Sequence, residues 1–211
     1  MKKTILLASL ILIAFDATIP SFAYNETDLE KLKKLNACER CDLTEAYLLG
    51  ANLSGADLSD ANLSDANLSG AALKGTNLTK ANLRECALYK AWIKNADCSG
   101  ANLQNIKASQ TQMQDTVFKG AKLEGADLSG ARLERTNFED AGLQTANLNH
   151  ANLKGANLKR ADLRGANLHH VVGLTREQIE LALIDKKTLL PNYLKIKWTS
   201  ETAFEFLNDK N

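Results

Sequence analysis

The chain has 211 residues, with 26 Lys and Arg against 25 Asp and Glu, so its formal net charge is +1. An apolar fraction of 45% with so little net charge excludes a disordered chain. The neutral balance gives no basic footprint for nucleic acid. Only 6% of the residues are aromatic, which is unusual because cores of this size normally rely on large rings.

Residues 1–23 have the composition of a secretory signal peptide. Lys2 and Lys3 are followed by 11 residues without a charge, at positions 5–15, and Ser21 and Ala23 are the small residues of a cleavage site. An uncleaved anchor is the alternative, but this run is shorter than the roughly 20 residues that span a bilayer. We therefore expect an exported protein, periplasmic or secreted, with no stable membrane span after cleavage.

Residues 24–40 are predicted to form an N-terminal helical cap. The mature chain would start near Tyr24 with 24 basic and 24 acidic residues, after two lysines and one aspartate are removed. Leu29, Leu32 and Leu35 lie on one side of a charged segment, which is typical of a short helix with one buried face.

A five-residue period then runs through residues 41–170. Every fifth position from Leu43 to Leu168 gives 26 positions, of which 20 are Leu. Two residues earlier, from Cys41 to Ala166, 19 of 26 are Ala. On a helix such a period drifts around every side and forms no stripe. An apolar pair separated by one polar residue is instead typical of a short strand with one buried face, and the next two residues form a bend.

These units, such as Ala51-Asn52-Leu53-Ser54-Gly55, resemble the pentapeptide-repeat family, whose consensus reads Ala-(Asp/Asn)-Leu-x-x. The resemblance implies an all-β fold: a right-handed quadrilateral β-helix with four units per coil, about 6.5 coils, and Leu and Ala filling the centre. Residues 20 apart should then stack, so we expect Phe118 to lie beside Phe138. Residues 104–118 depart furthest from the consensus, and we expect a bulged or bent stretch there.

Cys38 and Cys41 form a Cys-x-x-Cys pair where the repeat begins. A thioredoxin-like centre needs a βαβ context that the chain lacks. A zinc site needs more ligands, and Cys86 and Cys98 supply no second close pair. Two interpretations stay open: a disulfide in an oxidising compartment, or two small buried side chains.

Outward aromatic residues give a candidate partner patch. By the phase of the repeat, Tyr89 and Trp92 face solvent, and Arg84, Lys90 and Lys94 flank them. Exposed aromatic and basic side chains are frequent at interface hot spots. Packing against the tail is the alternative.

Three further features concern charge and histidine. His150 and His170 should be neighbours on adjacent coils, but no third metal ligand is evident. Acidic residues without Lys or Arg occupy residues 41–70, whereas residues 150–170 are mainly basic. Head-to-tail association is one use of this asymmetry, and plain solubility is the alternative. A homo-oligomer formed through the end caps is a separate expectation.

Residues 171–211 are predicted to form a C-terminal helical cap and tail. Thr175 and Gln178 fit a capping box before an apolar run, and Pro191 interrupts the chain. We expect a last helix from Thr199 to Leu207.

No catalytic set stands out from the repeat, so we expect no enzymatic activity, cofactor or metal. The favoured function is a scaffold that binds an unidentified protein partner through its rod surface. One alternative is a secreted effector acting in host cells. The other is a DNA-mimicking gyrase-binding protein, as the family's best-understood members are. That activity needs an acidic surface and a cytoplasmic location, which the neutral charge and the signal peptide disfavour.

Overall fold

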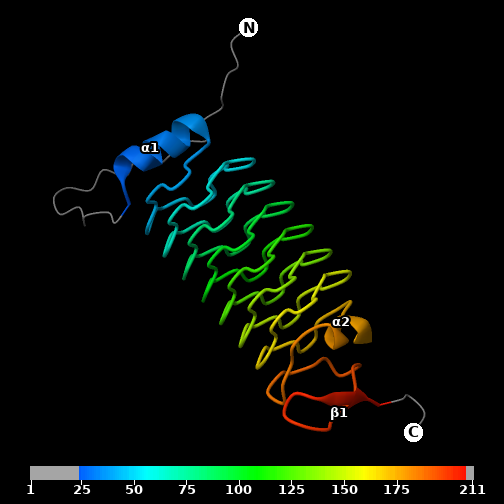
Figure 1. Ribbon diagram of the computed structural model, residues 1–211. Helices are drawn as coiled ribbons and strands as arrows, with labels where there is room; N and C mark the ends of the chain where they lie inside the picture. Colours follow the sequence, from blue (N-terminus) through cyan, green and yellow to red (C-terminus); the bar gives the residue numbers. More distant parts are fainter. Residues whose placement is uncertain (1–23, 208–211) are drawn as a thin grey trace, which may run out of the picture.

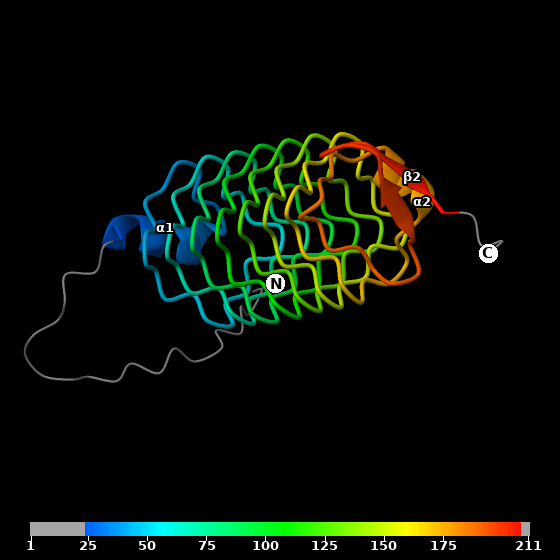
Figure 2. The ribbon, with the colours of Figure 1, turned by 90° about the horizontal axis from the view of Figure 1, so that it is seen from below.

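The protein is a stack of coils between a helix and a small hairpin (Figures 1 and 2). A computed structural model describes residues 24–207, so the predicted signal peptide lies outside the described residues. Helix α1 (Glu26–Leu35) lies at one end, and α2 (Arg176–Glu180), β1 (Ile196–Trp198) and β2 (Phe204–Phe206) lie at the other. Between positions 24 and 207, no helix has the length and apolar character needed to cross a membrane.

Parallel bridges join residues 20 positions apart along the coils, from Ala37 and Asp57 to Asn152 and Val172. A coil therefore takes four five-residue units and has four sides. We name the sides by the inward residues of their first units: face 1 starts at Leu43, face 2 at Leu48, face 3 at Leu53 and face 4 at Leu58. Each unit adds to these main-chain bonds between coils; for example, the Leu43 N–H donates to the Asn62 carbonyl at 2.7 Å.

The interior consists of the two apolar series of the repeat. Every residue of the Leu series is buried, and so is every residue of the Ala series except Ala51. The predicted contact between Phe118 and Phe138 is confirmed, because their rings stack at 5.2 Å with an interplanar angle of 7°. Such a narrow core holds Ala and Leu well and large rings poorly, which explains the low aromatic content.

The last residue of each unit turns the chain at a corner with a left-handed backbone. From Glu45 to His170 all 26 of these residues have a positive φ, and ten of them are glycines. Glycine adopts this conformation without a steric penalty, whereas the β-branched Thr145, at φ 58°, is sterically strained in it.

The prediction of a bulge or bend at residues 104–118 is wrong. The bridges of Lys107, Gln112 and Val117 continue the 20-residue spacing without interruption. Two buried hydroxyls explain why the departures fit: Thr111 Oγ1 donates to the Leu88 carbonyl at 2.9 Å, and Thr116 Oγ1 donates to the Ile93 carbonyl at 2.8 Å. The substituted side chains therefore stay inside without an unpaired polar group.

Helix α1 forms as predicted and lies across the first coil. Asn25 caps it by accepting from the Thr27 N–H at 2.9 Å, and Leu32 is buried. Leu29 packs partly against the core, whereas Leu35 is exposed, because the chain leaves the helix at Asn36 in a left-handed conformation.

The predicted capping box at the other end is confirmed. Thr175 Oγ1 accepts from the Gln178 N–H, and the Gln178 side chain accepts from the Thr175 N–H. Pairing with the coils continues past residue 170, since Leu183 bridges Asp162 and Leu189 bridges Asn167.

The predicted helix from Thr199 to Leu207 is wrong, because strands β1 and β2 pair there as an antiparallel hairpin. Ile196, Trp198, Phe204 and Phe206 alternate with polar residues at a period of two, and this alternation buries one side of a strand pair. The rings of Trp198 and Phe204 pack edge to face across the hairpin, with their centroids 5.7 Å apart.

Candidate interaction surface

The outward residue in the middle of each unit closes a local turn when it is Asn or Asp. Its Oδ1 accepts a hydrogen bond from the main-chain N–H two residues later. This bond forms at every Asn and Asp of the series: Asp42, Asn52, Asp57, Asn62, Asn67, Asn77, Asn82, Asp97, Asn102, Asp127, Asn137, Asn147, Asn152, Asn157, Asp162 and Asn167. Each such bond contributes roughly 0.5–1.5 kcal/mol to stability.

On faces 1 and 4 these side chains also bond to one another between coils. Asn82 Nδ2 donates to Asn62 Oδ1 at 2.8 Å on face 1. Asn77 Nδ2 donates to Asp57 Oδ1 at 3.0 Å on face 4. Through the first coils, the outer middle positions of these two faces are therefore all Asn or Asp: Asp42, Asn62, Asn82 and Asn102 on face 1, and Asp57, Asn77 and Asp97 on face 4. We call this set the polar ladder.

Faces 2 and 3 replace that ladder with apolar side chains over the same coils. Trp92 bridges Ala72 on face 3, and on face 2 Asn67 lies between Tyr47 and Ala87. Tyr47, Ala72, Ala87 and Trp92 lack the carboxyl or amide oxygen with which Asn and Asp accept the main-chain N–H two residues later. We call the resulting surface the apolar patch; its members are Tyr47, Leu49, Ala72, Ala87, Tyr89 and Trp92. Its large side chains are well exposed: Tyr47 69%, Leu49 51%, Tyr89 42% and Trp92 58%.

The charges around the patch are basic. Between Tyr47 and Asn95 the outward positions of faces 2 and 3 carry no Asp or Glu. Lysines border the patch instead, at Lys74, Lys90, Lys94 and Lys107, and all four are exposed. The Lys90 ammonium lies over the Tyr89 ring, 4.8 Å from its centroid. Carboxylates begin at the corner between faces 1 and 2, with Glu45, Asp65 and Glu85.

The structure separates one residue of the predicted patch from the others. Tyr89 and Lys90 end face 2, and Trp92 and Lys94 follow around the corner on face 3. Arg84 lies on face 1, where it pairs with Glu85 at 2.7 Å. The sequence interval from 84 to 94 therefore spans two corners of the coil.

The phase of the repeat also places Tyr47 outward, whereas the neighbours Leu49, Ala72, Ala87 and Lys74 are brought to the patch only by the coiling of the chain. The sequence does carry a signal for Ala72 and Ala87, since each stands where most units have Asn or Asp. Placing them beside Trp92 and Tyr89 requires the 20-residue spacing of the bridges.

Arginines in the later coils form direct ion pairs with carboxylates on neighbouring coils. Arg135 Nε donates to Asp115 Oδ1 at 2.7 Å, and Arg160 Nη2 donates to Asp140 Oδ2 at 2.7 Å. Hydrogen bonding from Arg160 holds the pKa of Asp140 below its usual range. The basic character of the C-terminal coils is thus partly neutralised on the rod itself.

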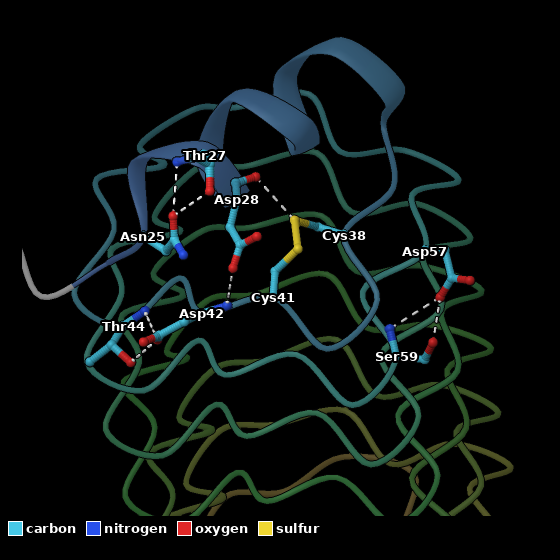
Figure 3. Close-up of a disulfide and its surroundings, with 9 residues drawn as sticks. All are labelled: Asn25, Thr27, Asp28, Cys38, Cys41, Asp42, Thr44, Asp57 and Ser59. Carbon is cyan, nitrogen blue, oxygen red and sulfur yellow. Dashed lines mark hydrogen bonds between the residues drawn. A yellow bond between two sulfur atoms is a disulfide. The ribbon is translucent and has the colours of Figure 1, made fainter.

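The N-terminal cysteines lie beneath α1 and form a disulfide (Figure 3). Both Cys38 and Cys41 are buried. Burial in the core raises the pKa of the Cys86 thiol to about 12 and raises that of Cys98. Those two cysteines are therefore inert core side chains.

The histidines stack as the spacing predicts, with the rings of His150 and His170 at 4.7 Å and an interplanar angle of 11°. In-plane lone pairs of two nearly parallel rings do not converge on one ion. The His150 and His170 pair is therefore poorly arranged to chelate a metal.

Taken together, the five-residue units, the 20-residue spacing of the bridges and the buried Ala and Leu series define a solenoid with a narrow apolar interior. The sequence matches the family described as Pentapeptide repeats in eight copies, at residues 38–71, 61–97, 96–135 and 141–172. These matches cover more than half of the chain, and the protein belongs to this family. Its members form right-handed quadrilateral β-helices.

Solved structures of other proteins are similar to this chain. HetL, a pentapeptide repeat protein involved in heterocyst differentiation regulation in the cyanobacterium Nostoc sp. strain PCC 7120, is 34% identical with a TM-score of 0.64, over 74% of this chain and 68% of HetL. QnrB1, a plasmid-mediated fluoroquinolone resistance protein, is 20% identical with a TM-score of 0.43, over 74% of this chain and 80% of QnrB1. A search of curated proteins found no match.

Proposed function

We propose that this protein is an exported, non-enzymatic scaffold that binds a protein partner through the apolar patch on faces 2 and 3. The export part of the proposal rests on the signal-peptide composition of residues 1–23. In the same proposal, α1 and the C-terminal hairpin act as caps that cover the strand edges at the ends of the rod.

The observation that carries the proposal is the replacement of the Asn and Asp ladder by exposed apolar side chains at one place. The rod gains stability from every ladder residue, so Tyr47, Ala72, Ala87 and Trp92 contribute less to folding than Asn would. The large side chains of the patch remain exposed, and Tyr and Trp are frequent at interface hot spots. A requirement other than folding accounts for their presence.

The chemistry of the patch indicates an acidic partner surface with apolar side chains of its own. Lys74 and Lys90 are exposed and have no acid on the neighbouring coils of their faces, so they attract carboxylates. Lys94 and Lys107 are partly neutralised, because Asp115 interacts with Lys94 and Asp127 bridges Lys107. Tyr47, Tyr89 and Trp92 supply apolar area that a purely polar surface would leave uncovered. Faces 1 and 4 of a second copy offer the carboxylates but no large apolar side chain in these coils, which disfavours self-association through the patch.

Crosslinking in the exported fraction tests the binding site. Wild type should form a discrete crosslinked complex, and a variant with Tyr89→Ser and Trp92→Asn should lose it while unfolding at or above the wild-type thermal midpoint. These substitutions insert the residues that other units carry at the same positions, as at Ser69 and Asn52. Arg84→Ser on face 1 is the matched control and should retain the complex.

An identical set of crosslinked products from all three proteins would contradict the patch as the binding surface. Cell fractionation with N-terminal sequencing tests export separately. A mature start near Tyr24 in the periplasm or medium is expected, and cytoplasmic retention with an intact N-terminus would contradict it.

A further inference from the structure

Beneath α1, three side chains with metal-ligating atoms meet at one point. The ligand atoms of Asp28, Cys38 and Cys41 all lie within 4.8 Å of one another. Asp28 comes from the first turn of α1, and the cysteines come from the segment that enters the first coil (Figure 3). Two sulfurs and one carboxylate oxygen form a donor set that suits zinc, whereas Mg²⁺ and Ca²⁺ prefer oxygen alone.

We propose that the reduced protein holds one Zn²⁺ between Asp28, Cys38 and Cys41. A thiol reductant first converts the disulfide to two thiols, and two reductant thiols become one reductant disulfide. Zinc then binds both sulfurs as thiolates and releases two protons. The sulfurs must separate to reach the ion at about 2.3 Å each, so the disulfide and the zinc site exclude one another.

The surroundings of Asp28 orient its carboxylate toward this role. Asp28 Oδ2 accepts from the Asp42 N–H at 2.8 Å, and the Asn25 N–H donates to the Asp42 carbonyl at 3.0 Å. These two bonds fix the start of α1 on the first coil. Within residues 24–207 the other carboxylate oxygen, Oδ1, makes no hydrogen bond and is available to an ion. Outer hydrogen bonds of this kind hold metal-binding carboxylates in place.

The remaining cysteines do not compete for the ion. Cys86 and Cys98 lie inside the rod, and burial raises the pKa of both thiols. Zinc binds thiolates, so these residues stay protonated and unligated. The proposed site has three protein ligands and a fourth position for water, and it is independent of the proposed partner surface.

Titration of the purified protein with Zn²⁺ alone, in competition with a chromophoric chelator, tests the site. The reduced protein should bind one ion per chain and the oxidised protein none. Co²⁺ in place of Zn²⁺ should give thiolate charge-transfer absorption and the visible bands of a tetrahedral ion. Failure of the reduced protein to bind, or equal binding by the oxidised protein, would overturn the proposal.

Asp28→Asn separates metal ligation from helix packing. The amide oxygen can still accept from the Asp42 N–H, so the unfolding midpoint of the oxidised variant should stay unchanged. Its reduced form should bind Zn²⁺ at least about tenfold more weakly. Asp60→Asn, which removes an exposed carboxylate on face 4, is the control and should bind as wild type does. Equal affinities for Asp28→Asn and wild type would remove Asp28 from the site.

Discussion

In the first coils of the rod, faces 1 and 4 and faces 2 and 3 enclose the same Ala and Leu core but carry different outer side chains. Faces 1 and 4 present Asn and Asp that bond within and between coils, as Asn62 and Asn82 do. They also hold seven carboxylates in these coils: Asp42, Glu45, Asp57, Asp60, Asp65, Glu85 and Asp97. Faces 2 and 3 present exposed rings and lysines instead.

This difference shows which outer residues the fold requires. The bridges between coils are the same on all four faces, since main-chain groups make them. Outer side chains adjust stability in steps of about a kcal/mol, whereas inner ones decide whether the rod forms. The outer surface is therefore free to carry a binding site at a small cost in stability.

The largest expected effect tests the inward and outward assignment on which the comparison depends. Leu128 is fully buried on face 2, and Ser129 is its outward neighbour. Leu128→Lys should abolish cooperative folding, because an unpaired charge in this dry core costs several kcal/mol. Ser129→Lys should be tolerated, since the Ser129 main-chain N–H still donates to Asp127. Circular dichroism melting compares the two, and equal midpoints would contradict the phase of the repeat.

A pair of outer substitutions of opposite sign tests the ladder directly. Asn82→Ala on face 1 removes the acceptor of the Arg84 N–H and the donor to Asn62, and should destabilise by about 1–2 kcal/mol. Ala87→Asn on face 2 supplies an acceptor for the Tyr89 N–H and should stabilise by about 0.5–1 kcal/mol. Urea unfolding measures both. A destabilised Ala87→Asn variant would show that the apolar patch contributes to folding.

Replacing a corner residue with glycine, or a corner glycine with another residue, should change stability in the same direction on every face. The corner residues Gly125, Thr145 and Gly165, which stack at intervals of 20 positions, offer a test. Thr145 is a β-branched residue at φ 58° between Gly125 and Gly165 in the stack. Thr145→Gly should stabilise by about 1 kcal/mol, because glycine removes the left-handed strain and gives back part of the gain as chain entropy. Gly125→Ala is the opposite change and should destabilise, because alanine at φ 67° carries the left-handed strain that glycine avoids. Its Cβ would also lie 2.4 Å from Asn105 Oδ1, so the Asn105 side chain would have to move. Thermal unfolding of both variants should give opposite shifts.

The sequence predicted the coil well because the fold repeats one local rule. Leu43 and Leu163 face inward for the same reason, so a period read along the chain gives the core residue by residue. The repeat carries no information about its ends: the hairpin at Ile196 and Phe206 forms only because it has the last coil to pack on. Asp28 meets Cys38 through the way α1 crosses the first coil, and no spacing in the sequence encodes that contact.

The smallest expected effect concerns acid, where ladder residues on face 4 differ from their neutral equivalents. Hydrogen bonds from the Ser59 hydroxyl and N–H hold the pKa of Asp57 below its usual value of 3.8. A carboxyl with a lowered pKa stabilises the fold above its unfolded pKa, and this contribution disappears as the pH falls through the folded value. Asp57→Asn should therefore change stability little at pH near 7, since an amide oxygen accepts the same N–H at Asn62. Between about pH 4 and pH 2 the variant should lose less stability than wild type, by a few tenths of a kcal/mol.

Ser59→Ala, which keeps the N–H but removes the hydroxyl, should lie between them in urea titrations at pH 7 and pH 3. Parallel pH profiles for all three proteins would show that the Asp57 charge does not contribute to the ladder, and the contrast between faces would then rest on its amide and main-chain hydrogen bonds alone.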